Sequence, residues 1–174
     1  MDILEALLTR RAIRKFKKDP VPQEMLEKIL EAGRWSPSAS NSQPWDFIVI
    51  TEPDLRRRLS RSFMYGSFLA EAPLGIAVVV DPWRSGCAVQ DGAIAAYGMW
   101  LAAHGLGLGA CWVNPNMDET RVRELLNLPE GRELICILAI GYPAQSVKSV
   151  RRKLKDIVHI ERYGNRGEGR AEEE

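Results

Sequence analysis

A run of basic residues close to the N-terminus has the side chains needed to bind an anion. Six positive charges fall within the nine residues from Arg10 to Lys18. Guanidinium groups bind phosphate oxygens through two parallel hydrogen bonds, and Arg10, Arg11 and Arg14 cannot all point the same way along a helix. The run therefore indicates either a solvated basic face or an anion site toward which some of these arginines point.

Nucleic acid is not an expected partner of this run. Proteins that bind single strands interleave aromatic side chains with basic ones, and proteins that bind a duplex insert a reading element into a groove. The run is poor in aromatic residues, and no reading element is evident. The whole chain has 24 basic and 23 acidic residues, which argues against a protein coated overall with nucleic acid or acidic lipid.

A polar loop with the sequence SPSASNSQPW, residues 36–45, is the second candidate site. A surface turn would explain its serines and prolines, but would not require Asn41, Gln43 and Trp45 so close together. Small polar side chains and backbone groups in such a loop can hydrogen-bond the edge of a flat heterocycle. Downstream, Phe63 and Phe68 are expected either to roof a substrate site or to lie in the core.

The elements that must position these segments can be placed from hydrophobic spacing and from helix caps. Asp2 with Glu5 three residues later predicts a capped N-terminal helix, and Pro22 begins a second helix that ends near Gly33. Further helices are predicted at 53–62, 87–104 and 117–126. The 87–104 helix is apolar nearly all round, so we expect it to be central and a candidate for a subunit contact. Strands are predicted at Trp45–Ile50, Gly75–Val80, Leu108–Val113 and Leu134–Ile140.

Composition points to one ordinary globular domain. The chain has 174 residues, of which 45% are apolar and 27% charged, and its net charge is +1. A chain of this length buries a sizeable core without a disulfide or a metal. The longest apolar stretch, Ala93–Leu108, is shorter than the roughly 20 residues of a membrane span. We therefore expect no membrane segment.

Three separated cysteines, Cys87, Cys111 and Cys136, give no disulfide framework and no zinc-ligand spacing. Each lies among apolar residues, so we expect three buried thiols. The N-terminus is acidic where a secretory signal would be basic, and a cytoplasmic location fits best. His104 and His159 are expected to be ordinary core or surface histidines.

The C-terminal part of the chain is basic from about Gln145, with a short apolar piece at Ile157–Ile160. This piece is expected either to pack on a partner subunit or to fold back on its own chain. Residues 165–174 contain almost only Gly, Arg and Glu and are expected to be disordered. The predicted domain therefore covers residues 1–164.

Several motifs in order along the chain resemble the FMN-dependent nitroreductase family. They are TRRAIRKF at 9–16, SPSASNSQPWDFIVI at 36–50, LGLGACWV at 106–113, IGYPA at 140–144 and RRKLKDIVHIERYG at 151–164. The resemblance implies an α+β fold with a mixed β-sheet flanked by helices. It also implies an intertwined homodimer with FMN at the subunit interface.

The resemblance assigns roles to the basic residues. Arg10 and Arg11 would bind the FMN phosphate, and Arg14 would approach the pyrimidine edge of the flavin ring. A cation there stabilises the negative charge left near N1 and O2 by two-electron reduction. Arg151 would return to the phosphate, with Arg152 as the neighbouring candidate. Ala12 stands where the family often has a hydroxyl residue, so one phosphate hydrogen bond would come from the backbone.

The polar loop and the end of the third strand complete the site that the resemblance implies. Pro37, Ser38 and Ala39 would lie along the flavin of the other subunit, and Asn41 and Gln43 would complete the polar motif. After Val113 the family presents a small residue or a backbone N–H to flavin N5. Here the run is Asn114-Pro115-Asn116; proline has no N–H, so Asn114 is the candidate donor.

The implied activity is transfer of hydride from NADH or NADPH through flavin N5 to a small acceptor, with ping-pong kinetics. The acceptor would be a nitroaromatic, a quinone or another electron-poor compound. GLGLG at 105–109 lacks the spacing of a Rossmann site, so the nicotinamide would bind transiently over the flavin. The alternatives are a specialised flavin enzyme, such as a dehalogenase or one that fragments its own flavin, and a non-catalytic flavin-binding protein.

Overall fold

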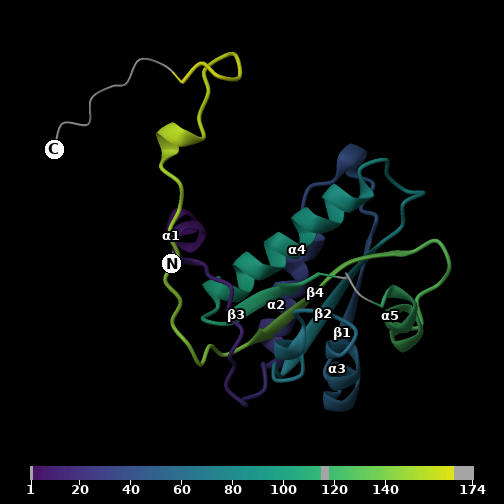
Figure 1. Ribbon diagram of the computed structural model, residues 1–174. Helices are drawn as coiled ribbons and strands as arrows, with labels where there is room; N and C mark the ends of the chain where they lie inside the picture. Colours follow the sequence, from purple (N-terminus) through teal and green to yellow (C-terminus); the bar gives the residue numbers. More distant parts are fainter. Residues whose placement is uncertain (1, 115–117, 167–174) are drawn as a thin grey trace.

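Four strands form a single sheet in a computed structural model that describes residues 2–114 and 118–166. The strands are β1 (Trp45–Ile50), β2 (Leu74–Val80), β3 (Gly109–Val113) and β4 (Glu133–Gly141), arranged in the order β1-β2-β4-β3 (Figure 1). All three strand pairs are antiparallel. The α+β class is confirmed. The expected mixed sheet is corrected, because parallel pairing occurs among the described residues only as the isolated bridge between Ala12 and Ala110.

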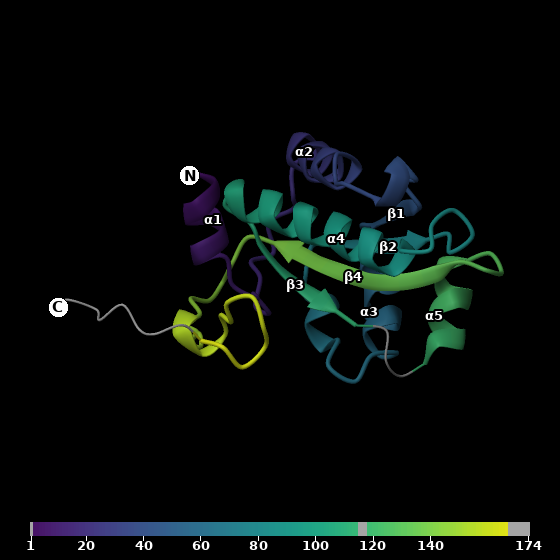
Figure 2. The same ribbon diagram turned by 90° about the horizontal axis from the view of Figure 1, so that it is seen from above.

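Helices cover both faces of this sheet. Figure 2 shows α2 (Gln23–Arg34) and α4 (Ala88–Gly105) on one face, with α3 (Pro53–Ser60) and α5 (Glu119–Leu126) on the other. The short α1 (Ile3–Thr9) lies near the C-terminal end of α4. The described residues also form 3-10 turns at Ala39–Asn41 (η1), Ser67–Leu69 (η2) and Leu154–Asp156 (η3). Because both faces are covered, every residue of β2 is buried.

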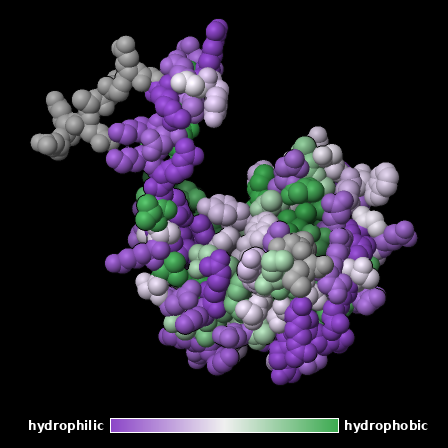
Figure 3. All heavy atoms as spheres, viewed as in Figure 1, coloured by the Kyte–Doolittle hydropathy of each residue, from purple (hydrophilic) through white to green (hydrophobic). Residues whose placement is uncertain are grey.

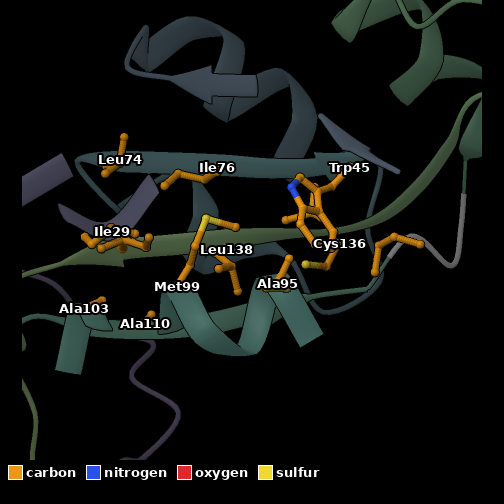
Figure 4. Packing of buried hydrophobic residues seen from close by; sticks show 14 of the residues in the cluster. Ile29, Trp45, Leu74, Ile76, Ala95, Met99, Ala103, Ala110, Cys136 and Leu138 are labelled. Carbon is orange, nitrogen blue, oxygen red and sulfur yellow. The ribbon is translucent and has the colours of Figure 1, made fainter. Parts of the chain in front are cut away.

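The central position predicted for the long apolar helix is confirmed. Ala95, Met99 and Ala103 of α4 are fully buried in the core cluster that includes Ile76 and Leu138 of the sheet (Figure 4). Small residues on this face of α4 let the helix approach the sheet closely. Away from the core, α4 exposes the apolar residues Val89, Ile94 and Tyr97, so this helix separates the core from a partly apolar surface.

Aspartate side chains cap two helices, and the cap at Asp2 is the one that was predicted. The Asp2 carboxylate accepts a hydrogen bond of 2.9 Å from the Glu5 backbone N–H at the start of α1. Asp118 accepts one of 3.0 Å from the Arg121 N–H at the start of α5. Both carboxylates satisfy donors that a helix leaves free at its N-terminus.

The cysteines differ from expectation at one position. Cys111 and Cys136 are buried, and burial raises the pKa of both thiols. Cys87 is exposed, which corrects the prediction of a third buried thiol. It precedes the first turn of α4, and the apolar residues that follow it in sequence turn away from it into the helix.

The C-terminal segment leaves the globular part as an arm. Val150, Leu154 and Tyr163 are 94%, 73% and 93% exposed, and the segment extends away from the sheet in Figure 1. The arm is therefore not buried on its own chain in the described part. Asn165 and Arg166 are described, whereas the rest of the tail predicted to be disordered lies outside the described residues.

The sequence also predicted no membrane segment and no zinc site. Within residues 2–114 and 118–166, no helix is long and apolar enough to cross a membrane. The same residues contain no group of three or more metal-ligating side chains.

Candidate functional site

Four of the predicted arginines surround one cavity, here called the basic cavity. It has a volume of about 300 Å³ and is lined by Arg10, Arg11, Ala12, Arg14, Trp100, Val147, Ser149 and Arg151. No carboxylate lines it, and none of the four arginines forms an ion pair with a described residue. Such a concentration of uncompensated positive charge favours binding of an anion.

The N-terminal segment reaches the cavity because the sheet holds it in place. The Ile13 N–H donates to the Ala110 carbonyl of β3 at 3.0 Å, and the Lys17 N–H donates to the Tyr142 carbonyl at 2.9 Å. Successive side chains of an extended segment point to opposite sides. Arg10 and Arg14 can therefore face the cavity while Ile13 packs into the core, where it is 8% exposed.

Arg10 is fixed by an aromatic side chain that sequence reasoning missed. Its guanidinium carbon lies 4.2 Å from the centre of the Trp100 ring and 5.9 Å from that of Tyr97. Trp100 was not predicted as a site residue, because it belongs to the alanine-rich helix that was expected to lie in the core. The Nε atom of Arg10 and the Nε1 atom of Trp100 are buried without a hydrogen-bond partner among the described residues. An anion in the basic cavity would supply the missing acceptor.

Arg11 is partly committed to the backbone. Its Nη1 atom donates to the carbonyls of Leu8 at 2.7 Å and Arg10 at 2.9 Å, which fixes the end of α1. Its Nε atom is buried without a described partner. On the far side of Arg11, His104 lies 2.9 Å from the Thr9 hydroxyl. Burial, aided by Arg10 and Arg11, lowers the pKa of His104, which favours the neutral imidazole.

A second, aromatic cavity adjoins the first at Arg14. It has a volume of about 200 Å³ and is lined by Arg14, Phe63, Tyr65, Phe68, Trp112, Val113 and Asn114. The Arg14 guanidinium lies 5.8 Å from the centre of the Phe68 ring. Phe63 and Phe68 are both core residues and cavity walls, so their two expected roles coincide. Asn114 is exposed at this cavity; Pro115 and Asn116 lie outside the described residues.

The polar loop is not part of either cavity in the single chain. Pro37, Ser38, Ala39, Asn41 and Gln43 line neither of them. The Ala39 N–H donates to Asp91 of α4, whereas Arg10 stacks on Trp100 of the same helix. Nine residues of helix separate these anchors by about 14 Å. The structure thus brings the arginines and residues 113–114 together, and places the loop at the other end of α4.

Close contact at Gly109 gives a test of how the arginine segment is held. A Cβ atom at Gly109 would lie 2.7 Å from the Cβ of Ile13, which cannot move without its backbone. Gly109→Ala should therefore push residues 10–14 away from β3 and lower the free energy of unfolding by about 1–3 kcal/mol. Denaturant unfolding measures the change.

Gly105 at the end of α4 is the matched control, because a Cβ there meets nothing within 4 Å. Gly105→Ala should leave the free energy of unfolding unchanged or raise it by up to about 1 kcal/mol. Equal stability of the two variants would contradict the proposed tight packing of the segment.

Known proteins match most of this chain in sequence and in fold. The profile of the nitroreductase family matches residues 7–79 and 60–142. A protein of Methanothermobacter thermautotrophicus, provisionally named an NADH dehydrogenase/NAD(P)H nitroreductase, is 37% identical over 169 residues, covering 94% of this chain and 88% of that protein. The solved FMN-dependent nitroreductase of Clostridium difficile R20291 has a TM-score of 0.87 and 32% identity, covering 92% of this chain and 100% of that one.

A solved protein of Desulfovibrio desulfuricans, provisionally named a nitroreductase, is in complex with FMN; its TM-score is 0.83 and its identity 33%, covering 91% of this chain and 95% of that one. More distant relatives carry other names. Iodotyrosine deiodinase of Nematostella vectensis is 25% identical, covering 90% of this chain and 74% of that protein. The 5,6-dimethylbenzimidazole synthase of Rhodospirillum rubrum is 29% identical, covering 83% of each. The family profile, the sequence similarity and the fold agree, and the chain belongs to the nitroreductase family.

Proposed function

We propose that this protein is an FMN-dependent oxidoreductase that takes electrons from NADH or NADPH and passes them to a small electron-poor acceptor. The observation that carries the proposal is the basic cavity, where four arginines meet without a described carboxylate. It opens beside an aromatic cavity of the kind that stacks a flat heterocycle. A phosphate and a flat ring are the two ends of FMN.

The residues present fit this cofactor. The buried Nε atoms of Arg10 and Arg11 lack described partners, and Arg151 closes the same cavity from the C-terminal segment. These side chains would hold the phosphate, with backbone groups near Ala12 replacing an absent hydroxyl. When bound, FMN supplies two-electron transfer through N5 and carries negative charge near N1 and O2 after reduction.

Arg14 links the two cavities and therefore has two roles in this proposal. Its guanidinium would orient the flavin ring and stabilise negative charge at the pyrimidine edge. Phe63, Phe68 and Trp112 exclude water from the inner wall of the aromatic cavity. Tyr65 is 77% exposed, so one wall is open to solvent. An open aromatic wall suits an exchange of flat donors and acceptors, such as nitroaromatics and quinones, at one site in turn.

We also propose that the working form is an intertwined homodimer. The outer face of α4 exposes Val89, Ile94 and Tyr97 at 53%, 44% and 39%, and Figure 3 shows hydrophobic side chains at the surface over this helix. A contiguous apolar patch on a helix favours association. In the dimer, the polar loop of one chain would complete the flavin site of the other, and the apolar residues of the arm would be covered. A cytoplasmic location is part of the same proposal.

The test is an absorption spectrum of protein that has been reconstituted with FMN and desalted, followed by anaerobic titration with NADH and then NADPH. We expect retained bands at roughly 450 nm that bleach with one of the two donors. Loss of FMN on desalting would contradict the proposal that this protein uses FMN as its cofactor. Retention without bleaching would support a non-catalytic flavin-binding protein instead.

A specialised flavin enzyme is the second candidate, because relatives named deiodinase and 5,6-dimethylbenzimidazole synthase share much of the chain. Membership in one fold family does not decide between these chemistries. The reduced protein would be mixed with a nitroaromatic, a quinone, a halogenated phenol and oxygen. Rapid turnover of the first two favours the proposed reductase, whereas reaction confined to the halogenated compound, or oxygen-dependent loss of the flavin, favours the specialised enzyme.

A further inference from the structure

Asp91 in the first turn of α4 is a buried carboxylate that pairs with no cation among the described residues. The residue is 3% exposed, and no ion pair joins it to any residue in the described ranges. Its Oδ1 accepts the Ala39 N–H at 3.1 Å, and its Oδ2 accepts the Ser85 hydroxyl at 2.7 Å. A buried charge is stable only when such bonds satisfy it, so the carboxylate is committed to these two partners.

The loop bound by Asp91 has an unusual backbone. Ser40, Asn41 and Gln43 have φ values of 51°, 55° and 47°, in the left-handed region that residues with a Cβ seldom occupy. Such conformations persist only where surrounding contacts hold them. The Gln43 N–H donates to the Ser38 hydroxyl at 3.0 Å, which closes the loop on itself but does not fix it to the rest of the protein.

The attachment to the protein is the bond between Ala39 and Asp91. It is the one hydrogen bond that joins residues 38–43 to another element within the described part of the chain. Ser85 fixes the carboxylate in turn, since its hydroxyl donates to Asp91 and accepts the Cys87 N–H at 3.0 Å. The positive end of the α4 helix dipole favours negative charge at this position.

We propose that Asp91 is a positioning residue: it holds the polar loop in the conformation that contacts the FMN bound by the arginines of the partner subunit. This inference rests on the proposed function. It adds that the loop reaches the partner's flavin site only when the Asp91 carboxylate holds it, although Asp91 lines neither cavity. Ser85, whose hydroxyl donates to the Asp91 carboxylate, is a second positioning residue. Asp91 and Ser85 are together called the clamp.

The first experiment compares the FMN affinity of three variants with that of the unaltered protein by quenching of flavin fluorescence. Asp91→Ala removes both hydrogen bonds and should weaken binding about 10- to 100-fold, the range for loss of a bond to a charged group. Asp91→Asn keeps an acceptor for the Ala39 N–H and should restore affinity to within about fivefold, because a neutral hydrogen bond is weaker. Ser85→Ala should fall between these two. Asp54→Ala, at an exposed position of α3, is the control and should bind FMN normally.

The second experiment uses differently tagged subunits to form mixed dimers. One pairing places Arg10→Ala on one chain and Asp91→Ala on the other. If the loop of each chain contacts the FMN bound by the other chain, both substitutions affect the same site and the other site stays intact. The second pairing places both substitutions on one chain beside an unaltered chain, which damages both sites. We expect about one tightly bound FMN per dimer in the first pairing and none in the second.

The outcomes separate this inference from the proposed function. Unaltered protein that fails to bind FMN overturns both. Unaltered protein that binds FMN, with Asp91→Ala binding equally well, overturns the inference alone, as does the reverse pattern in the mixed dimers. Where Asp91→Ala does not accumulate as a folded dimer, Asp91→Asn and Ser85→Ala decide: affinity equal to that of the control in both variants overturns the clamp.

Discussion

Replacing Arg10 and Arg14 together with alanine should abolish retention of FMN. Arg10 stacks on Trp100 at the basic cavity, and Arg14 borders both cavities. Each charge-assisted contact contributes about 1.5–3 kcal/mol, so loss of two should weaken binding about 10²- to 10⁴-fold. Calorimetric titration of the apoprotein with FMN measures the affinity, and the flavin absorbance that survives desalting gives an independent check.

The matched control removes two positive charges from the same run without touching either cavity. Lys17 and Lys18 are exposed and line neither the basic nor the aromatic cavity. Lys17→Ala/Lys18→Ala should therefore retain FMN. Full retention by the double arginine variant would exclude the assignment of the basic cavity to the phosphate.

Placing a charge on the outer face of α4 should convert the proposed dimer into monomers and thereby release FMN. Ile94 is 44% exposed between Val89 and Tyr97. An aspartate there would have to be buried without a partner, at a cost of at least about 2 kcal/mol, or about 30-fold in dimer affinity. Light scattering coupled to gel filtration should show Ile94→Asp as a monomer with weakened FMN binding, because each site would lack the loop of its partner.

Arg58 of α3 is the comparison position, because it is exposed and α3 covers the face of the sheet opposite to α4. Arg58→Asp should remain dimeric and bind FMN. A dimer of Ile94→Asp as stable as that of Arg58→Asp would show that α4 does not form the subunit contact.

The elements of this fold were largely readable from the chain because their signals are local. β1 was predicted with its observed bounds, Trp45–Ile50, since this run is rich in aromatic and β-branched residues. Asp2 marked the start of α1 because a carboxylate at that spacing satisfies a free helix N–H. The positions of the four arginines around one cavity followed the resemblance to the family, and the structure brings them together.

Features that depend on tertiary neighbours could not be predicted. Trp100 looked like a core residue because its spacing along α4 gives no sign that Arg10 stacks on it. Cys87 has apolar sequence neighbours but lies outside the helix that they form. The left-handed backbone of Ser40 has no signal in residue type, since serine seldom adopts it. The antiparallel pairing of β4 likewise depends on partners distant in sequence.

The place of β4 in the sheet has a consequence for how the protein folds during synthesis. Among the described strands it is the last along the chain, yet it lies between β2 and β3, and it is the one described strand with which β3 pairs. The N-terminal segment is in turn tied to the end of β4, because the Ala144 N–H donates to the Lys15 carbonyl at 2.9 Å. The arginines of the N-terminal segment are among the first residues made, but their cavity cannot form until Arg151, which also lines it, has left the ribosome. Contacts across such long sequence separations slow folding, and the nascent chain would expose β3 and its apolar side chains until β4 has been made.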